Sequence, residues 1–244
     1  MSFPSQFRRI GSILVPFNLP VRRTAAPVTP AEPLSPRTAR RKGFSEHHAL
    51  SLYSSQVCLN NRLEEALFAW AETEPLVVDV QVVNLVISYK IEGKTRTTKL
   101  PLKVALRSGS VVYWDCVSAE GGNSRGVNAK QEFAEAAGAG YRLMPWKFFA
   151  ERRHELRGRL GLQNVLHSGQ VIDTTGIESQ AMLRLVDGPR TISELAAVVG
   201  ASDLAMQVAA ARLWRAGRVQ LPIAESPLNM RWLVSLGVTH EDQL

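Results

Sequence analysis

The feature that most restricts the fold of this chain is a series of three apolar, β-branched runs between residues 76 and 117. In the first run, Val78, Val80 and Val82 alternate with other residues, as they do in a pleated strand. Turn-forming residues separate the runs at 92–94 and 107–110. The runs cover 76–89, 95–106 and 111–117. Three strands joined by short turns therefore predict a meander, in which the first run forms one or two strands.

Helical patterns flank this meander. Leu63, Leu67 and Trp70 recur at helical spacing within 59–71, and a Glu-Pro pair ends that helix. After the meander the pattern predicts a helix, a short strand and a second helix. These elements cover 127–137, 141–144 and 146–156. The order helix, three strands, helix, strand, helix predicts an α/β fold with a mixed sheet.

The last third of the chain has a different pattern. Residues 157–176 carry several glycines and little periodicity, which predicts a domain boundary. A helix at 177–186 follows, and Thr191 and Glu194 form a capping box that opens a second helix. Gly200 ends that helix. A third helix, capped by Ser202 or Asp203, runs to about Ala216, and a short strand follows at 217–222. This order predicts a winged helix-turn-helix domain.

The chain thus divides into three parts: a basic Pro/Arg-rich tail at 1–43, an α/β domain at 44–160, and a winged-helix domain with a C-terminal tail at 170–244. Residues 1–42 hold eight basic residues against one acid, a charge of +7 that equals the net charge of the whole chain. Seven of the 13 prolines lie there too, so this segment cannot form a core. A flexible basic arm suits a phosphate backbone, and a solubilising or protein-binding arm is the alternative. The cations nearest the α/β domain are Arg37, Arg40, Arg41 and Lys42.

Other signals are weaker. The third helix offers few polar residues before Arg212, so contact of Arg212, Arg215 and the following Arg218 with DNA backbone, or docking on a protein, is favoured over base reading. The Gly-rich loop 121–126 lacks the Lys-Ser/Thr of a P-loop; it is a mobile loop or contacts phosphate through Arg125. No apolar run approaches about 18 residues, so no membrane span is predicted. The two cysteines have no metal-ligand or disulfide pattern, which suits a cytoplasmic protein.

Several segments, taken in order, are similar to a known family. A basic run precedes Gly43-Phe44-Ser45, a helix contains Asn61–Glu65, the chain returns toward the sheet at Asp79–Val83, and a helix, glycines and a strand fill Phe133–Met144. From about Arg37 onward, the chain resembles the TnsA-like endonuclease subunits of heteromeric transposases. The resemblance implies a restriction-endonuclease-like domain followed by a winged-helix domain.

The resemblance also locates an active site that has lost half of its residues. In the family, a helix acid, a strand Asp and an acid or amide on the next strand hold a divalent metal, and a Lys two residues further orients water. Glu64 matches the helix acid, and Asp115 matches the acid of the second strand. Leu102, after Pro101, stands in place of the Asp, and Val117 in place of the Lys. A vestigial site with no metal and no cofactor is therefore expected.

Three functions follow as hypotheses. The first is a DNA-binding, TnsA-like assembly subunit of a transposition complex that no longer cleaves, with transposon-end duplex DNA, a transposase and an AAA+ regulator as partners and a nucleoid-associated location. The second is an active Mg²⁺- or Mn²⁺-dependent endonuclease in which Asp79, Glu92 or Glu120 supplies a ligand. The third is a winged-helix transcriptional regulator with an α/β sensor domain.

Overall fold

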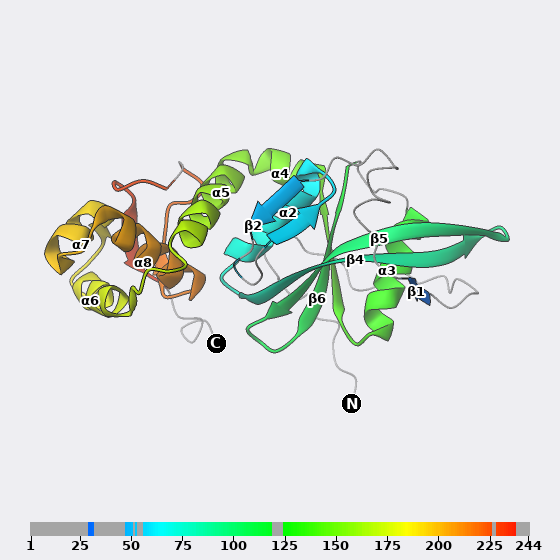
Figure 1. Cartoon of the computed structure of the whole chain (residues 1–244), viewed down its shortest axis with the longest axis horizontal. Coiled ribbons are helices and arrows are strands. Elements are labelled where there is room, and N and C mark those ends of the chain that lie inside the picture. The colour runs from blue at the N-terminus through cyan, green and yellow to red at the C-terminus, as the bar shows by residue number, and fades with distance from the viewer. Residues whose placement is uncertain are drawn as a thin grey trace, which may run out of the picture.

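The computed structural model describes residues 29–31, 47–50, 52, 56–118, 124–225 and 228–237. Its elements form an N-terminal unit built on a mixed sheet and a C-terminal unit that is mostly helical (Figure 1). The two units lie side by side along the long axis of the molecule, and helix α5 (Arg153–Ser168) runs between them. The α/β class expected from the sequence is confirmed.

The main sheet has the strand order β1-β4-β5-β6-β7. Its strands are β1 (Thr29–Ala31), β4 (Val77–Ile91), β5 (Lys94–Leu106), β6 (Val111–Val117) and β7 (Gly140–Pro145). Strands β4, β5 and β6 form the antiparallel meander predicted from the three apolar runs, and β7 pairs with β6 in parallel. Strand β1 comes from the proline-rich tail and pairs with the outer edge of β4, which the composition of that tail did not predict.

The first apolar run is a single strand of 15 residues, and it contains a β-bulge. Val82 pairs with Leu102, but Leu85 pairs with Leu100, so two residues of β4 face one residue of β5. Asn84, inside the bulge, has a φ of 47°, a left-handed conformation that asparagine tolerates better than most residues. The bulge therefore explains why the alternation of this run changes phase after Val82.

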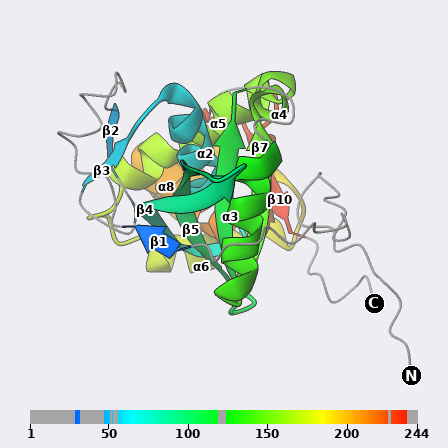
Figure 2. The same ribbon diagram turned by 90° about the vertical axis from the view of Figure 1, so that its right-hand side faces the viewer.

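Helices cover both faces of the sheet. Helix α2 (Arg62–Thr73) places Leu67 and Phe68 in an apolar core with Trp114 of β6. Helix α3 (Ser124–Ala136) connects β6 to β7 and lies on the opposite face, because Asp115, the neighbour of Trp114, bonds to it. Figure 2 shows α3 on the near side of the strands. A small hairpin of β2 (His47–Leu50) and β3 (Gln56–Leu59) precedes α2.

The segment 157–176, where a domain boundary was expected, begins as helix, because α5 continues through it to Ser168. The predicted helix at 146–156 is divided into α4 (Trp146–Glu151) and the start of α5. Gly158 inside α5 and Gly169 at its C-cap both allow close packing against the C-terminal unit. A Cβ atom on Gly158 would lie 2.2 Å from the carbonyl oxygen of Ile223, and one on Gly169 would lie 2.3 Å from Cγ2 of Val208. Residue 160, the expected domain end, therefore lies inside a helix that both units share.

The C-terminal unit combines three helices with a small antiparallel sheet. Its elements are α6 (Thr175–Leu185), β8 (Arg190–Thr191), α7 (Ile192–Val199), α8 (Asp203–Arg215), β9 (Val219–Gln220) and β10 (Leu233–Leu236). The sheet has the order β8-β10-β9. The predicted capping box of Thr191 and Glu194 is confirmed, and the Ser202 side chain caps α8. Strand β10 was not predicted, because it was included in the expected C-terminal tail.

No single helix in the described part of the chain is long and apolar enough to span a membrane. Helices α7 and α8 meet the length and composition test only together, and they are bent by 114° where they join.

Candidate functional site

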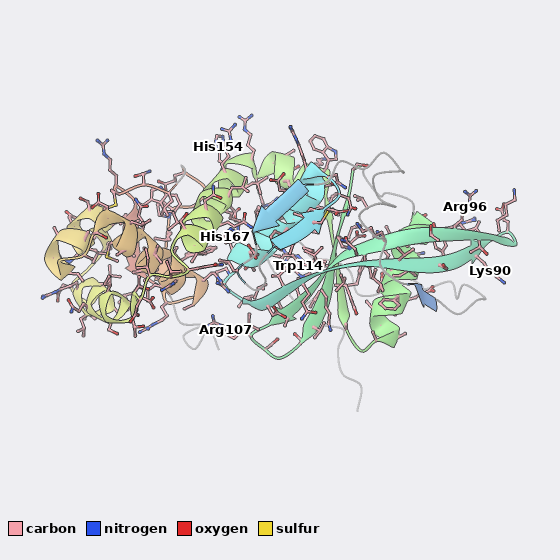
Figure 3. All side chains as sticks on the ribbon, in the orientation of Figure 1. Lys90, Arg96, Arg107, Trp114, His154 and His167 are labelled. Atoms are coloured by element: carbon pink, nitrogen blue, oxygen red, sulfur yellow. The ribbon has the colours of Figure 1, made fainter. Side chains whose placement is uncertain are left out.

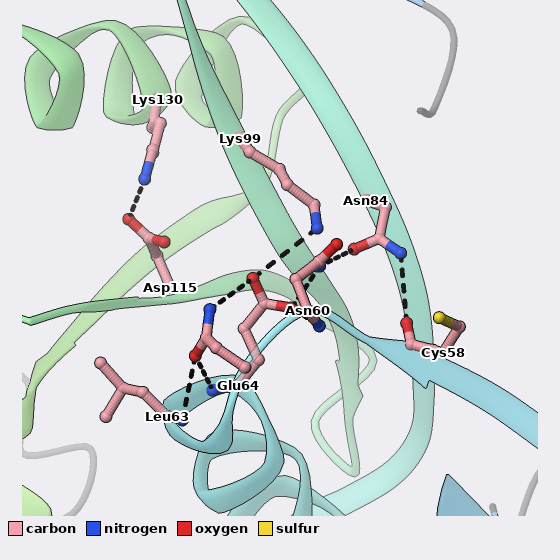
Figure 4. A network of polar contacts seen from close by, with 9 residues as sticks. Cys58, Asn60, Leu63, Glu64, Asn84, Lys99, Asp115 and Lys130 are labelled. Carbon is pink, nitrogen blue, oxygen red and sulfur yellow. Dashed lines mark hydrogen bonds and ion pairs between the residues drawn. The ribbon is translucent and has the colours of Figure 1, made fainter. Parts of the chain in front are cut away.

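The helix acid expected from the sequence, Glu64, lies in the first turn of α2 and is almost fully buried. Its Oε2 accepts hydrogen bonds from the backbone N–H and the side-chain amide of Asn60, at 2.9 and 2.6 Å. Its Oε1 lies 3.6 Å from Nζ of Lys99 on β5 (Figure 4). Asn61, the N-cap, accepts from the backbone N–H groups of Leu63 and Glu64 and so orients this turn. Both oxygens of Glu64 are therefore engaged by donors from this chain.

Lys99 is held between opposing electrostatic effects. Burial lowers the pKa of its ammonium below the ordinary lysine value of 10.5, and the nearby Glu64 carboxylate partly offsets that effect. Cys116 of β6 is also close to these charges. Burial raises the pKa of the Cys116 thiol well above its usual range, and the charges of Asp115 and Glu64 raise it further. Cys116 is therefore a protonated thiol and a poor nucleophile or metal ligand.

The second acid, Asp115 on β6, is 1% exposed. Nζ of Lys130, from α3, donates to its Oδ2 at 2.6 Å, and the hydroxyl of Tyr141, from β7, donates to the same oxygen at 2.7 Å. Burial and the Asp115 charge raise the pKa of Tyr141, so its phenol stays protonated as a donor. Asp115 of β6 therefore forms a short, buried charge pair, and its two partners are held by two other elements, α3 and β7.

The two replaced positions are apolar in the structure as well as in the sequence. Leu102 is fully buried in the core under α2 and pairs across the sheet with Trp114. Val117 ends β6 opposite Pro145 of β7. In the described part of the chain, no group of three or more His, Cys, Asp or Glu side chains is placed to hold a metal ion. These residues do not fit Mg²⁺ or Mn²⁺. Each remaining carboxylate already binds an ammonium group, and the apolar Leu102 occupies the position of the expected Asp ligand.

The acids considered as substitute ligands lie elsewhere. Asp79 of β4 accepts from the Gln81 amide at 2.8 Å on the exposed surface. Glu92 is at the tip of the β4–β5 hairpin, 3.6 Å from a guanidinium nitrogen of Arg125. Glu120 lies outside the described residues. The structure thus brings neither Asp79 nor Glu92 into hydrogen-bond or ion-pair contact with Glu64 or Asp115.

The predicted DNA-binding cations have different environments. Arg37, Arg40, Arg41 and Lys42 lie outside the described residues. Arg125 and Arg218 are exposed. Arg215 is half-buried, and its carbonyl oxygen accepts a hydrogen bond from the guanidinium of Arg107 at 3.2 Å.

Arg212, for which contact with DNA backbone or docking on a protein was predicted, is engaged within the fold instead. Its guanidinium is half-buried and donates to the carbonyl oxygens of Gly169 and Ile172 at 2.9 and 2.8 Å, and to the hydroxyl of Thr174 at 2.6 Å. These acceptors lie at the end of α5 and in the segment that leads to α6. Arg212 thus closes a helix C-terminus, where a cation is favourable, and cannot reach DNA without breaking those bonds.

Helix α8, the third helix of the C-terminal unit, is also poorly placed to read bases. Eight of its 13 residues are buried, and they include Met206, Val208 and Leu213. Helix α5 packs against it so closely that a Cβ atom on Gly169, the C-cap of α5, would lie 2.3 Å from Cγ2 of Val208. A reading helix needs an open face with polar residues near its N-terminal end. Here the exposed residues at that end are Asp203 and the apolar Leu204, which do not suit the major groove.

Sequence reasoning missed Lys99 and Lys130, the two lysines that hold the remaining acids. A lysine in a strand or helix carries no signal of its partner, because both ion pairs join distant segments. No protein-family model matches the chain, and no curated protein matches its sequence.

Proposed function

We propose that this chain is a TnsA-like, DNA-binding assembly subunit of a transposition complex, with a restriction-endonuclease-like domain that no longer cleaves. Duplex DNA at transposon ends is the proposed ligand, and a nucleoid-associated location follows from it. A transposase and an AAA+ regulator are the proposed protein partners, and both are inferred by analogy with the family that the chain resembles.

The element order of the N-terminal unit supports this proposal. Helix α2, the meander β4-β5-β6, helix α3 and the parallel strand β7 follow one another in the order that the resemblance implies. Glu64 lies on the first helix, Leu102 on the second strand and Asp115 on the third, as the proposed alignment requires.

The C-terminal unit supports a winged-helix domain used for protein contact. The order α6-β8-α7-α8-β9-β10 and the three-residue turn between α7 and α8 are those of a winged helix-turn-helix. The burial of α8 under α5 favours docking on a protein over base reading. Leu183 of α6, Val186 at the C-cap of α6 and Val198 of α7 are exposed apolar side chains that such docking would cover.

The ion pairs of the two remaining acids are the main support for the proposed loss of cleavage. Glu64 is paired with Lys99, and Asp115 with Lys130, so ammonium groups supply the positive charge that a divalent metal would otherwise supply. An ammonium ion can neutralise a carboxylate, but it cannot polarise a bound water into a hydroxide-like nucleophile. The pairs explain how the fold keeps two buried acids after losing the Asp and the Lys of the motif.

The test is a combined cleavage and binding assay on supercoiled DNA and on duplexes with transposon ends, in Mg²⁺ or Mn²⁺. We expect binding without strand breaks. Metal-dependent breaks that disappear in Glu64→Gln or Asp115→Asn would make the protein an enzyme and overturn the proposal.

A second measurement tests the assembly role. Purified protein should associate with the transposase encoded beside it, and it should bind random duplex DNA almost as well as transposon ends when tested alone. A steep preference for one operator sequence would favour a transcriptional regulator instead. Absence of both duplex binding and transposase association would refute the proposal.

A further inference from the structure

The hairpin of β4 and β5 extends beyond the sheet as a two-stranded ribbon. Strand β6 pairs with β5 only at residues 102–105, and β1 pairs with β4 only at residues 86–88. Residues 89–96 are therefore paired with each other and with no other strand in the described part of the chain. Figure 1 shows this ribbon projecting at the end of the molecule opposite to the C-terminal unit.

The ribbon carries an excess of exposed positive charge. Lys90, Lys94 and Arg96 are all exposed, and Figure 3 labels two of them near the tip. The only acid of the ribbon is Glu92, which pairs with Arg125 from the first turn of α3. Four cations against one acid leave a charge of +3 on this surface.

The shape of the ribbon is fixed by its turn and by α3. Glu92 and Gly93 have φ values of 49° and 77°, which correspond to the tight two-residue turn that matches strand twist. Tyr89 is buried against α3, where a Cβ atom on Gly126 would lie 3.2 Å from its hydroxyl oxygen. This contact places Arg125, the residue before Gly126, on the same side of the ribbon as Arg96 and Lys94, which pair with Tyr89 and Ile91 across the hairpin. Lys90 projects from the opposite side, so the cations surround the tip of the ribbon.

We propose that the ribbon surface, defined as Lys90, Lys94, Arg96 and Arg125, is the element of the folded domain that binds duplex DNA. This inference rests on the proposed function, because it assumes that the protein binds DNA. A two-stranded ribbon fits the major groove, which is about 12 Å wide, and its cations can then contact phosphates.

The chemistry of the ribbon favours DNA over an acidic protein. Thr95 and Thr97 are exposed and offer hydroxyl donors to phosphate oxygens. All residues from 86 to 99 are described, and no large apolar side chain among them is exposed. The buried centre of a protein–protein interface needs such side chains, whereas a phosphate-binding surface does not.

The test is the salt dependence of binding of the full chain to a duplex of roughly 30 base pairs, a length sufficient for a site of this size. The ribbon variant combines Lys90→Gln, Lys94→Gln and Arg96→Gln. Loss of three phosphate contacts should lower the slope of log affinity against log salt by about 2.7. Between 50 and 200 mM salt, the affinity of the parent should therefore fall about 40-fold more than that of the variant.

The matched control combines Arg153→Gln, Arg157→Gln and Arg184→Gln, which removes three exposed cations from α5 and α6. We expect it to keep the slope of the parent, because those residues lie away from the ribbon. Since all six substituted side chains are exposed, both variants should keep the thermal stability of the parent.

The outcomes separate the two proposals. If the parent binds the duplex and the ribbon variant keeps its slope, the ribbon is not the DNA-binding element, although the proposed function stands. If both triple variants lose slope equally, net charge rather than the ribbon determines binding, and this inference is also wrong. If the parent itself does not bind duplex DNA, this inference fails together with the DNA-binding part of the proposed function, and transposase association then decides whether the assembly role stands.

Discussion

Two regions of this molecule use basic residues in opposite ways. At the ribbon end, Lys94 and Arg96 project into solvent. At the seam, the region where α5 lies between the two units, an arginine is buried instead. The guanidinium of Arg159, on α5, lies 4.2 Å from the ring centre of Trp70 and 5.3 Å from that of Trp214, and also pairs with Glu155. The exposed cations are available to a ligand, whereas Arg159 joins the two cores of the protein.

The difference shows that burial, and not the number of basic residues, decides what a cation does. A buried cation has exchanged its water for protein partners, so removing it leaves those partners unpaired and lowers stability. An exposed cation contributes little to stability but contributes to binding of a charged ligand. Mutations in the two regions should therefore change different measured quantities.

The largest effect is expected for Lys130→Met. The substitution leaves the Asp115 carboxylate buried without its cation, which should lower the free energy of unfolding by about 3–5 kcal/mol. Urea denaturation monitored by tryptophan fluorescence measures this change. The double variant Lys130→Met with Asp115→Leu should recover most of the loss, because no unpaired charge remains. A stability of Lys130→Met equal to that of the parent would mean that the pair is not formed.

The next effect concerns the seam. Gly158→Ala places a Cβ atom 2.2 Å from the carbonyl oxygen of Ile223, so α5 and the C-terminal unit must move apart. We expect a loss of about 3 kcal/mol in the free energy of unfolding. Gly176→Ala in α6 is the control, since nothing lies within 4 Å of its added Cβ atom. That control should be neutral or slightly stabilising, and equal behaviour of the two variants would contradict the close packing of α5.

A smaller effect on stability is expected to distinguish Arg212 from Arg218. The sequence predicted the same role, contact with DNA backbone or a protein, for both arginines. Arg212→Ala removes charge-assisted hydrogen bonds to Gly169, Ile172 and Thr174, which should lower the free energy of unfolding by about 2 kcal/mol. Its salt-dependent DNA affinity should not change. Arg218→Ala should leave stability unchanged, because its side chain is exposed. Thermal unfolding and DNA titration of both variants test this contrast, and reduced DNA affinity of folded Arg212→Ala would contradict it.

The sequence predicted what depends on local pattern and missed what depends on contacts between distant segments. Alternation and turn residues located β5 and β6, and Thr191 with Glu194 located the start of α7. The glycines between 157 and 176 led to the prediction of a boundary there. The sequence alone does not distinguish a glycine that permits close helix packing, such as Gly158, from one that ends a helix.

The candidate site follows the same rule. The motif was enough to select the four site positions, Glu64, Leu102, Asp115 and Val117. It did not identify the side chains that pair with the two acids. Lys99 and Lys130 reach the acids only after the sheet and α3 have formed. Burial of Arg212 likewise depends on α5 packing against α8.

The smallest expected effect is the contribution of Lys99 to the pH dependence of the free energy of unfolding. Lys99 is a partly buried cation, and is therefore intermediate between the exposed and the buried cations compared above. Burial lowers its pKa below 10.5 in the folded protein. Between that lowered pKa and 10.5, the unfolded chain binds more protons than the folded one, so the free energy of unfolding should rise with pH through this window. Nuclear magnetic resonance of ¹³C-labelled lysine ε-carbons can follow the titration, and Lys99→Met should remove both the resonance and this part of the stability slope. A Lys99 resonance that titrates at or above 10.5 would show that the Glu64 carboxylate outweighs burial, and Lys99 would then behave as a simple ion-pair partner.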